Sequence, residues 1–98
     1  MYLVRDVFNC KPGKANELIE RFKKSMALLG EAGGAGSIRF LVDYIATYWT
    51  VVLEAEVNDL GEFEKHMQEW RSRDDVRGIM EGYMDLVEGG HREIFRIV

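Results

Sequence analysis

Few side chains in this sequence could exchange a proton with a bound molecule near neutral pH. His66 is one of only 2 histidines, and Asp43, Tyr48 and Glu54 lie in or beside two apolar runs separated by a short break. A carboxylate, phenol or imidazole beside an apolar binding space can act as a general acid or base. The sequence therefore offers His66, Asp43 and Tyr48 as candidate catalytic residues.

His66 also has a spacing that could suit a metal ion. Glu62 and Glu69 lie four residues before it and three residues after it, so the three side chains share one face of a helix. Lys65 stands beside them, as is typical of a charged face in contact with water. We therefore predict a solvated helix face here and no metal site.

Two arginines could hold an anionic oxygen of a ligand. Arg5 and Arg39 both fall on predicted strands, and Asn9 and Glu54 fall on the same side of the predicted sheet. We predict that Arg5, Asn9, Arg39 and Glu54 line a binding cavity. His91 follows Gly90 in what we expect to be a loop, where it is a further acid–base candidate.

Composition excludes several classes of protein. The 98 residues fit one domain, 1–98, and the net charge of −4 lacks the basic face that nucleic acids or anionic membranes require. Cys10 is the single cysteine, which makes a reduced, cytoplasmic setting the expectation. No apolar run is long enough to span a bilayer, and a strand beginning at Tyr2 leaves no room for a signal peptide.

Hydrophobic periodicity predicts how the chain is organised. Strands are expected at 2–9, 37–44, 47–57 and 92–98, with a hairpin turn near 45–46 and a glycine-rich loop over 30–36. One helix carries an apolar stripe from Ala15 to Leu29 and stops at Gly30. A second follows an N-cap at Asn58 and carries apolar residues as far as Trp70.

A further helical segment is expected from Asp74 to Glu88. A capping box at Ser72–Asp75 would precede it and Gly89-Gly90 would end it; the alternative is a hairpin that turns at Gly89-Gly90. The order strand, helix, strand, strand, helix, strand predicts an α+β, ferredoxin-like split βαβ fold. Its four-stranded antiparallel sheet carries helices on one face.

The uncovered face of that sheet mixes aliphatic and charged side chains. Water would favour a mostly polar face, whereas a dry core would exclude the charges. Two such sheets packed face to face would bury the aliphatic residues and enclose the polar ones, so we predict a homodimer with a central cavity. The alternative is a plain interface with the charges at its rim and no ligand.

Two segments carry a family resemblance. Thr50 to Trp70 (TVVLEAEVNDLGEFEKHMQEW) and Leu86 to Val98 (LVEGGHREIFRIV) resemble the central strand with its helix, and the closing strand, of the dimeric α+β barrel superfamily. The nearest similarity is to NIPSNAP-like and antibiotic-biosynthesis-monooxygenase-like domains. The resemblance implies a homodimer, and it implies cofactor-free oxygenation of aromatic substrates, haem degradation or other small-molecule chemistry.

The sequence also resembles, in part, the haem-degrading branch of that superfamily. The site of that branch consists of an Asn on the first strand, a Trp and a helical His that ligates iron. Asn9, Trp49 or Trp70, and His66 are the residues that match in part. Trp49 falls on a strand and Trp70 follows the histidine, so neither tryptophan fits the pattern clearly.

The sequence as a whole predicts a homodimeric barrel that binds an apolar or aromatic small molecule without a cofactor. Its candidate activity is that of a cofactor-free monooxygenase, and the sequence leaves open whether any catalysis occurs. The alternatives are a non-catalytic dimerisation or regulatory module and a haem-binding or haem-degrading protein. No nucleic-acid or membrane partner is expected.

Overall fold

The computed structural model describes residues 1–28 and 38–98. Its elements in chain order are β1 (Tyr2–Cys10), α1 (Ala15–Ala27), β2 (Ile38–Val42), β3 (Thr50–Val57), α2 (Leu60–Ser72), α3 (Asp74–Met80), the 3-10 helix η2 (Tyr83–Leu86) and β4 (Val87–Arg96). The predicted helix stop at Gly30 and the loop after it lie outside the described residues.

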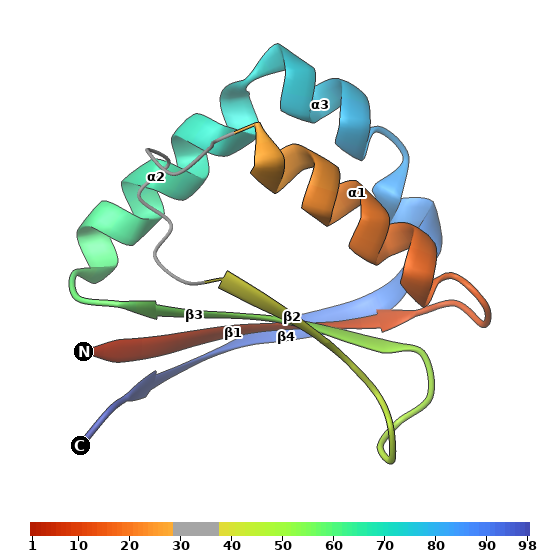
Figure 1. The fold of residues 1–98 in the computed structure, drawn as a ribbon, viewed down its shortest axis with the longest axis horizontal. Coiled ribbons are helices and arrows are strands. Elements are labelled where there is room, and N and C mark those ends of the chain that lie inside the picture. Colours follow the sequence, from red (N-terminus) through yellow and green to blue (C-terminus); the bar gives the residue numbers. More distant parts are fainter. Residues whose placement is uncertain (29–37) are drawn as a thin grey trace.

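The four strands form one antiparallel sheet in the order β2-β3-β1-β4. Figure 1 shows α1, α2 and α3 together on one side of this sheet. The predicted α+β, ferredoxin-like architecture is therefore confirmed. No helix of the described residues has the length and apolar character needed to cross a membrane.

The core lies between the helices and the sheet because both layers direct an apolar set toward each other. Leu18 and Phe22 from the stripe of α1 are buried against Val51 of β3, and Trp70 and Val76 enter from α2 and α3. Helical period and strand alternation produce these two facing sets.

The helix predicted from Asp74 to Glu88 is wrong in its second half. α3 ends at Met80, Gly82 takes a left-handed φ of 78°, and β4 already begins at Val87. Glycine adopts this conformation without a steric cost, so the chain turns back onto the sheet here. Gly89 and Gly90 lie inside β4 and end no helix, and the alternative hairpin at this pair does not form either.

Two predicted helix caps are displaced. Asp59, and not Asn58, caps α2, because its carboxylate accepts the backbone N–H of Glu62 at 3.0 Å. Ser72 is the last residue of α2, where its hydroxyl donates to the carbonyl of Glu69. The expected capping box at Ser72 therefore does not form.

The hairpin between β2 and β3 is wider than predicted. The strands stop at Val42 and start again at Thr50, so the connection covers 43–49 instead of two residues. Trp49 ends the alternation of β3 because its φ is 62°, a value that side chains other than glycine seldom adopt.

Candidate functional site

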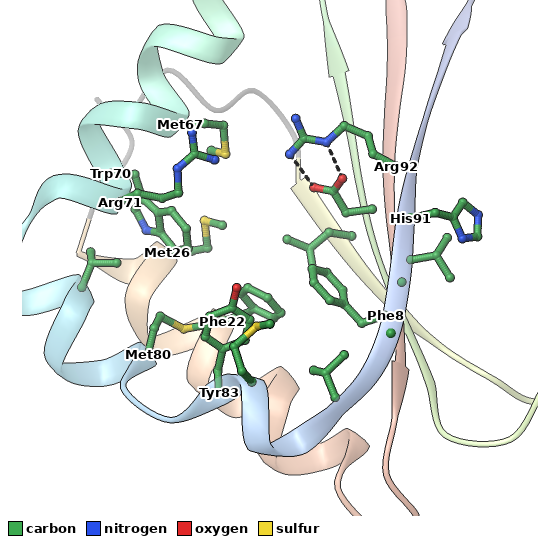
Figure 2. A pocket seen from close by; sticks show the side chains of 18 of the residues that line it. Phe8, Phe22, Met26, Met67, Trp70, Arg71, Met80, Tyr83, His91 and Arg92 are labelled. Carbon is green, nitrogen blue, oxygen red and sulfur yellow. Dashed lines mark hydrogen bonds and ion pairs between the residues drawn. The ribbon is translucent and has the colours of Figure 1, made fainter.

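A cavity of about 690 Å³ lies between the helices and the sheet (Figure 2). We call it the methionine cavity and define it by its lining residues. These are Asp6, Val7, Phe8, Phe22, Met26, Leu53, Met67, Trp70, Arg71, Val76, Arg77, Met80, Tyr83, Met84, Val87, Glu88, Gly89, Gly90, His91 and Arg92. The volume is that of a site for a small molecule, because protein interiors are otherwise closely packed.

Four of the 5 methionines in the chain line this cavity. Met26 comes from α1, Met67 from α2, Met80 from α3 and Met84 from η2. Met67 and Met80 are buried and Met26 is half-buried, whereas Met84 is exposed at the edge of the cavity. Their flexible thioethers fit apolar molecules of varied shape. The cavity wall can therefore adapt to its contents.

Aromatic side chains fix the more rigid part of the wall. Phe8 and Phe22 pack with ring centroids 5.2 Å apart, joining β1 to α1. The indole N–H of Trp70 donates to the carbonyl of Ser25 at 3.4 Å, joining α2 to α1. Because both residues of this hydrogen bond are buried, Trp70 presents a fixed apolar surface.

The polar side of the cavity is built around Arg92. Arg92 faces Asp6 across the β1–β4 pair and donates to both carboxylate oxygens of Asp6 through Nε and Nη2 (Figure 2). These hydrogen bonds raise the pKa of Arg92, so its guanidinium is charged at every accessible pH. Its Cζ also lies 5.7 Å from the ring centroid of Phe63 on α2.

Gly90 gives the cavity a wall without a side chain. A Cβ at this position would stand 2.3 Å from the carbonyl oxygen of Val7. Only glycine lets β4 approach β1 this closely, next to the register shift between Asn9 and Cys10.

Three of the residues predicted to line a cavity come together on the other face of the sheet, which we call the open face. Oε1 of Glu54 lies 3.4 Å from Nη2 of Arg5, and Oε2 of Glu54 lies 3.2 Å from Nη2 of Arg39. Nη1 of Arg5 lies 3.5 Å from Oε1 of Glu93. Strand register places Arg39, Glu54, Arg5 and Glu93 in one row across all four strands, with alternating charge. Asn9 lies on the same face between Thr50 and Gly89. None of Arg5, Asn9, Arg39 and Glu54 lines the methionine cavity.

The predicted catalytic residues do not form a cluster and do not line the methionine cavity. Asp43 closes the β2–β3 hairpin, since its carboxylate accepts the backbone N–H of Thr50 at 2.9 Å. Tyr48 is exposed on that hairpin, and His66 is half-buried on α2. Their assignment as a catalytic set stays a prediction.

His91 lies on strand β4 and not in the loop expected for it. Its imidazole points away from the methionine cavity (Figure 2), and its Nε2 is 3.5 Å from Glu93. His91 therefore belongs to the side-chain row of the open face that includes Val7 and Val52.

Haem binding stays a prediction, and the residues that match the haem site in part lie in different places of the fold. Asn9 lies on the open face, His66 lies outside the methionine cavity, and Trp49 lies at the end of the hairpin. Of the four candidates only Trp70 lines the cavity. Among the described residues, no three His, Cys, Asp or Glu side chains are placed to hold a metal ion.

The cavity residues that the sequence did not single out are Asp6, Arg71 and Arg92, together with the four methionines. Met67 and Met80 of this set are buried, whereas Met84 is 66% exposed. The sequence did contain a signal for the charged part of the cavity wall. Asp6 and Arg92 each lie two residues from an apolar residue of the same strand, Phe8 and Ile94, and so face the same side of the sheet.

The chain shares its α+β fold with several solved structures, so the resemblance seen in the sequence is confirmed at the level of fold. A NIPSNAP family protein from Agrobacterium tumefaciens superposes with a TM-score of 0.84 at 11% identity, covering 99% of this chain and 92% of that one. A NIPSNAP-like domain protein from Burkholderia xenovorans gives 0.83 at 12%, covering 99% and 84%. A structure described as an antibiotic biosynthesis monooxygenase gives 0.72 at 11%, covering 100% and 99%. No protein-family model and no curated protein matches the chain by sequence.

Proposed function

We propose that this protein binds an apolar or aromatic small molecule in the methionine cavity, and that it does so as a homodimer joined through the open face. The observation that supports the proposal is the cavity itself, about 690 Å³ within a domain of 98 residues. Apolar side chains that line an open hollow are in contact with water, which is unfavourable. A bound apolar ligand would remove this apolar surface from water.

The homodimer follows from the composition of the open face. Leu41, Val52 and Val7 form an apolar row across β2, β3 and β1, next to the row of alternating charges. The charges are already paired within one chain, so a second sheet could cover both rows without leaving an isolated charge. A cavity between the two sheets remains a prediction.

A neutral fluorescent probe tests the binding site. N-phenyl-1-naphthylamine, which brightens in apolar surroundings, should bind saturably to the purified protein. Met84→Trp places a larger side chain at the exposed edge of the cavity and should weaken binding, whereas Met84→Leu conserves volume and should not. Equal binding by all three proteins would refute the proposal.

Cofactor-free oxygenation is a second candidate function of the same cavity. The carboxylate of Asp6 and the phenol of Tyr83 lie on its wall as candidates for proton transfer, and the apolar remainder would desolvate an aromatic substrate. Oxygen uptake with the electron-rich anthrone dithranol, in the presence of a chelator, tests this candidate. Uptake should exceed that of a protein-free control and fall in Met84→Trp. No uptake above that control would favour a binding protein without catalysis.

A further inference from the structure

Two arginines at the methionine cavity share one weakly held carboxylate. Glu64 on α2 lies 3.7 Å from Nη2 of Arg71 and 3.6 Å from Nη1 of Arg92. Both distances are longer than a good hydrogen bond, and half of the Glu64 side chain is exposed to water. An exposed pair of this kind contributes at most about 1 kcal/mol.

Both guanidinium groups keep donors available for another acceptor. Arg92 uses Nε and Nη2 on Asp6 and turns Nη1 toward Glu64. Glu64 is the only ion-pair partner of Arg71 within residues 1–28 and 38–98. A guanidinium has five N–H donors in a planar fork, so one distant carboxylate leaves most of them unsatisfied.

Charged side chains line the cavity from both the sheet and the helices. Figure 2 shows Arg92 extending from β4 toward the helices, with Arg71 on the α2 side next to Met67. Arg77 of α3 also lines the cavity; the acids that line it are Asp6, already engaged by Arg92, and Glu88.

We infer that the ligand of the methionine cavity is an apolar acid bound as its anion. Its carboxylate would replace that of Glu64 between Arg71 and Arg92, and its body would lie among the methionines and Trp70. This inference rests on the proposed function and adds the chemical class of the ligand. A ligand carboxylate would reach both forks at the rim of the cavity, where the side chains of Arg71 and Arg92 are 50% and 36% exposed, and charge-assisted hydrogen bonds are the stronger kind.

A pair of probes that differ in charge tests the inference. 8-Anilinonaphthalene-1-sulfonate carries the same aromatic body as N-phenyl-1-naphthylamine plus an anionic group. Arg71→Gln should lower the affinity for the anionic probe by about tenfold, the loss expected for one charged hydrogen bond, and leave the neutral probe unchanged. Glu64→Gln should raise the affinity for the anionic probe, because the competing carboxylate is gone.

Lys65→Gln is the matched control, because it also removes one positive charge from α2, at the exposed position next to Glu64. It should leave the affinity for both probes within twofold of the wild type. Competition extends the test to the carboxylate itself: 1-naphthoate should displace the anionic probe, and 1-naphthamide should do so at least tenfold less well.

The outcomes separate this inference from the proposed function. If Met84→Trp lowers the affinity for the neutral probe while Arg71→Gln leaves the affinity for the anionic probe unchanged, the cavity is a binding site, and the inferred ligand class, an apolar acid, is wrong. Equal losses in Arg71→Gln and Lys65→Gln would also overturn the inference, since they would reflect net charge alone. Binding of neither probe would refute both proposals.

Discussion

Arg5 on β1 donates to the carboxylate of Glu54 on β3, with 3.4 Å between Nη2 and Oε1. The two residues face each other in register, and Glu54 is only 4% exposed although it lies on the sheet face without helices. Arg39 covers the other carboxylate oxygen at 3.2 Å. A buried acid is tolerated here because two guanidinium groups replace its hydration.

Replacing this carboxylate should weaken the sheet. Glu54→Gln keeps the shape of the side chain but removes the charge that both arginines bind, and we expect the free energy of unfolding to fall by about 1–2 kcal/mol. Urea denaturation measures this change. Glu56→Gln, an exposed position two residues along the same strand, should change it by less than about 0.5 kcal/mol. Similar losses in both variants would contradict this role for Glu54.

Adjacent glycines in β4 should respond oppositely to the same substitution. A Cβ at Gly90 would meet the carbonyl oxygen of Val7 at 2.3 Å, whereas a Cβ at Gly89 has no neighbour within 4 Å. We expect Gly90→Ala to lower the free energy of unfolding by about 1–3 kcal/mol and Gly89→Ala to leave it unchanged or slightly raised. Thermal unfolding checks this, because about 1 kcal/mol shifts the midpoint of so small a domain by roughly 4–8 °C. A stable Gly90→Ala variant would refute the close approach.

Cys10 should be chemically inert in the folded protein. Burial raises the pKa of its thiol, and the carboxylate of Asp43 raises it further. The nucleophilic thiolate is therefore scarce at pH 8, so a disulfide reagent should modify the native protein far more slowly than the urea-unfolded chain. The unfolded thiol ionises near its ordinary pKa of about 8.5. The contribution of Cys10 to the free energy of unfolding is hence complete below that pH, and it is lost as pH rises from there through the raised pKa of the folded thiol. Modification of the native protein at the rate of a free thiol would contradict this prediction.

The sequence was sufficient to predict the layers of this protein and which residues share a face. Alternation placed Arg5, Arg39 and Glu54 on one side of the sheet, where the structure joins them. It could not predict that they neutralise one another. That outcome depends on strand order, which brings β1 and β3 together although 39 residues lie between their nearest ends.

The methionine cavity was beyond sequence reasoning for a different reason. A period of 3.6 residues shows that Met67 and Met80 face inward, but it does not show how far the helix layer stands from the sheet. The sequence also did not show that the chain leaves the helix layer early, since α3 ends at Met80 and β4 begins at Val87. The same periodicity continued through Tyr83 and Val87, and so it overestimated the length of α3: Tyr83 lies in the 3-10 helix and Val87 begins β4.

A single charge at the centre of the open face should separate the proposed homodimer. Val52 lies between Leu41 and Val7 in the apolar row, and Val52→Lys would place an ammonium group against the facing sheet. Sedimentation velocity should give the wild type twice the 11.3 kDa of one chain and the variant the mass of a monomer. We expect dimer dissociation to become at least about 100-fold easier, because an unpaired charge is costly to bury. Gln68→Lys adds the same charge at an exposed site on α2 and should stay dimeric. A wild type that sediments as a monomer at high concentration would refute the homodimer, because the open face would then be exposed to solvent.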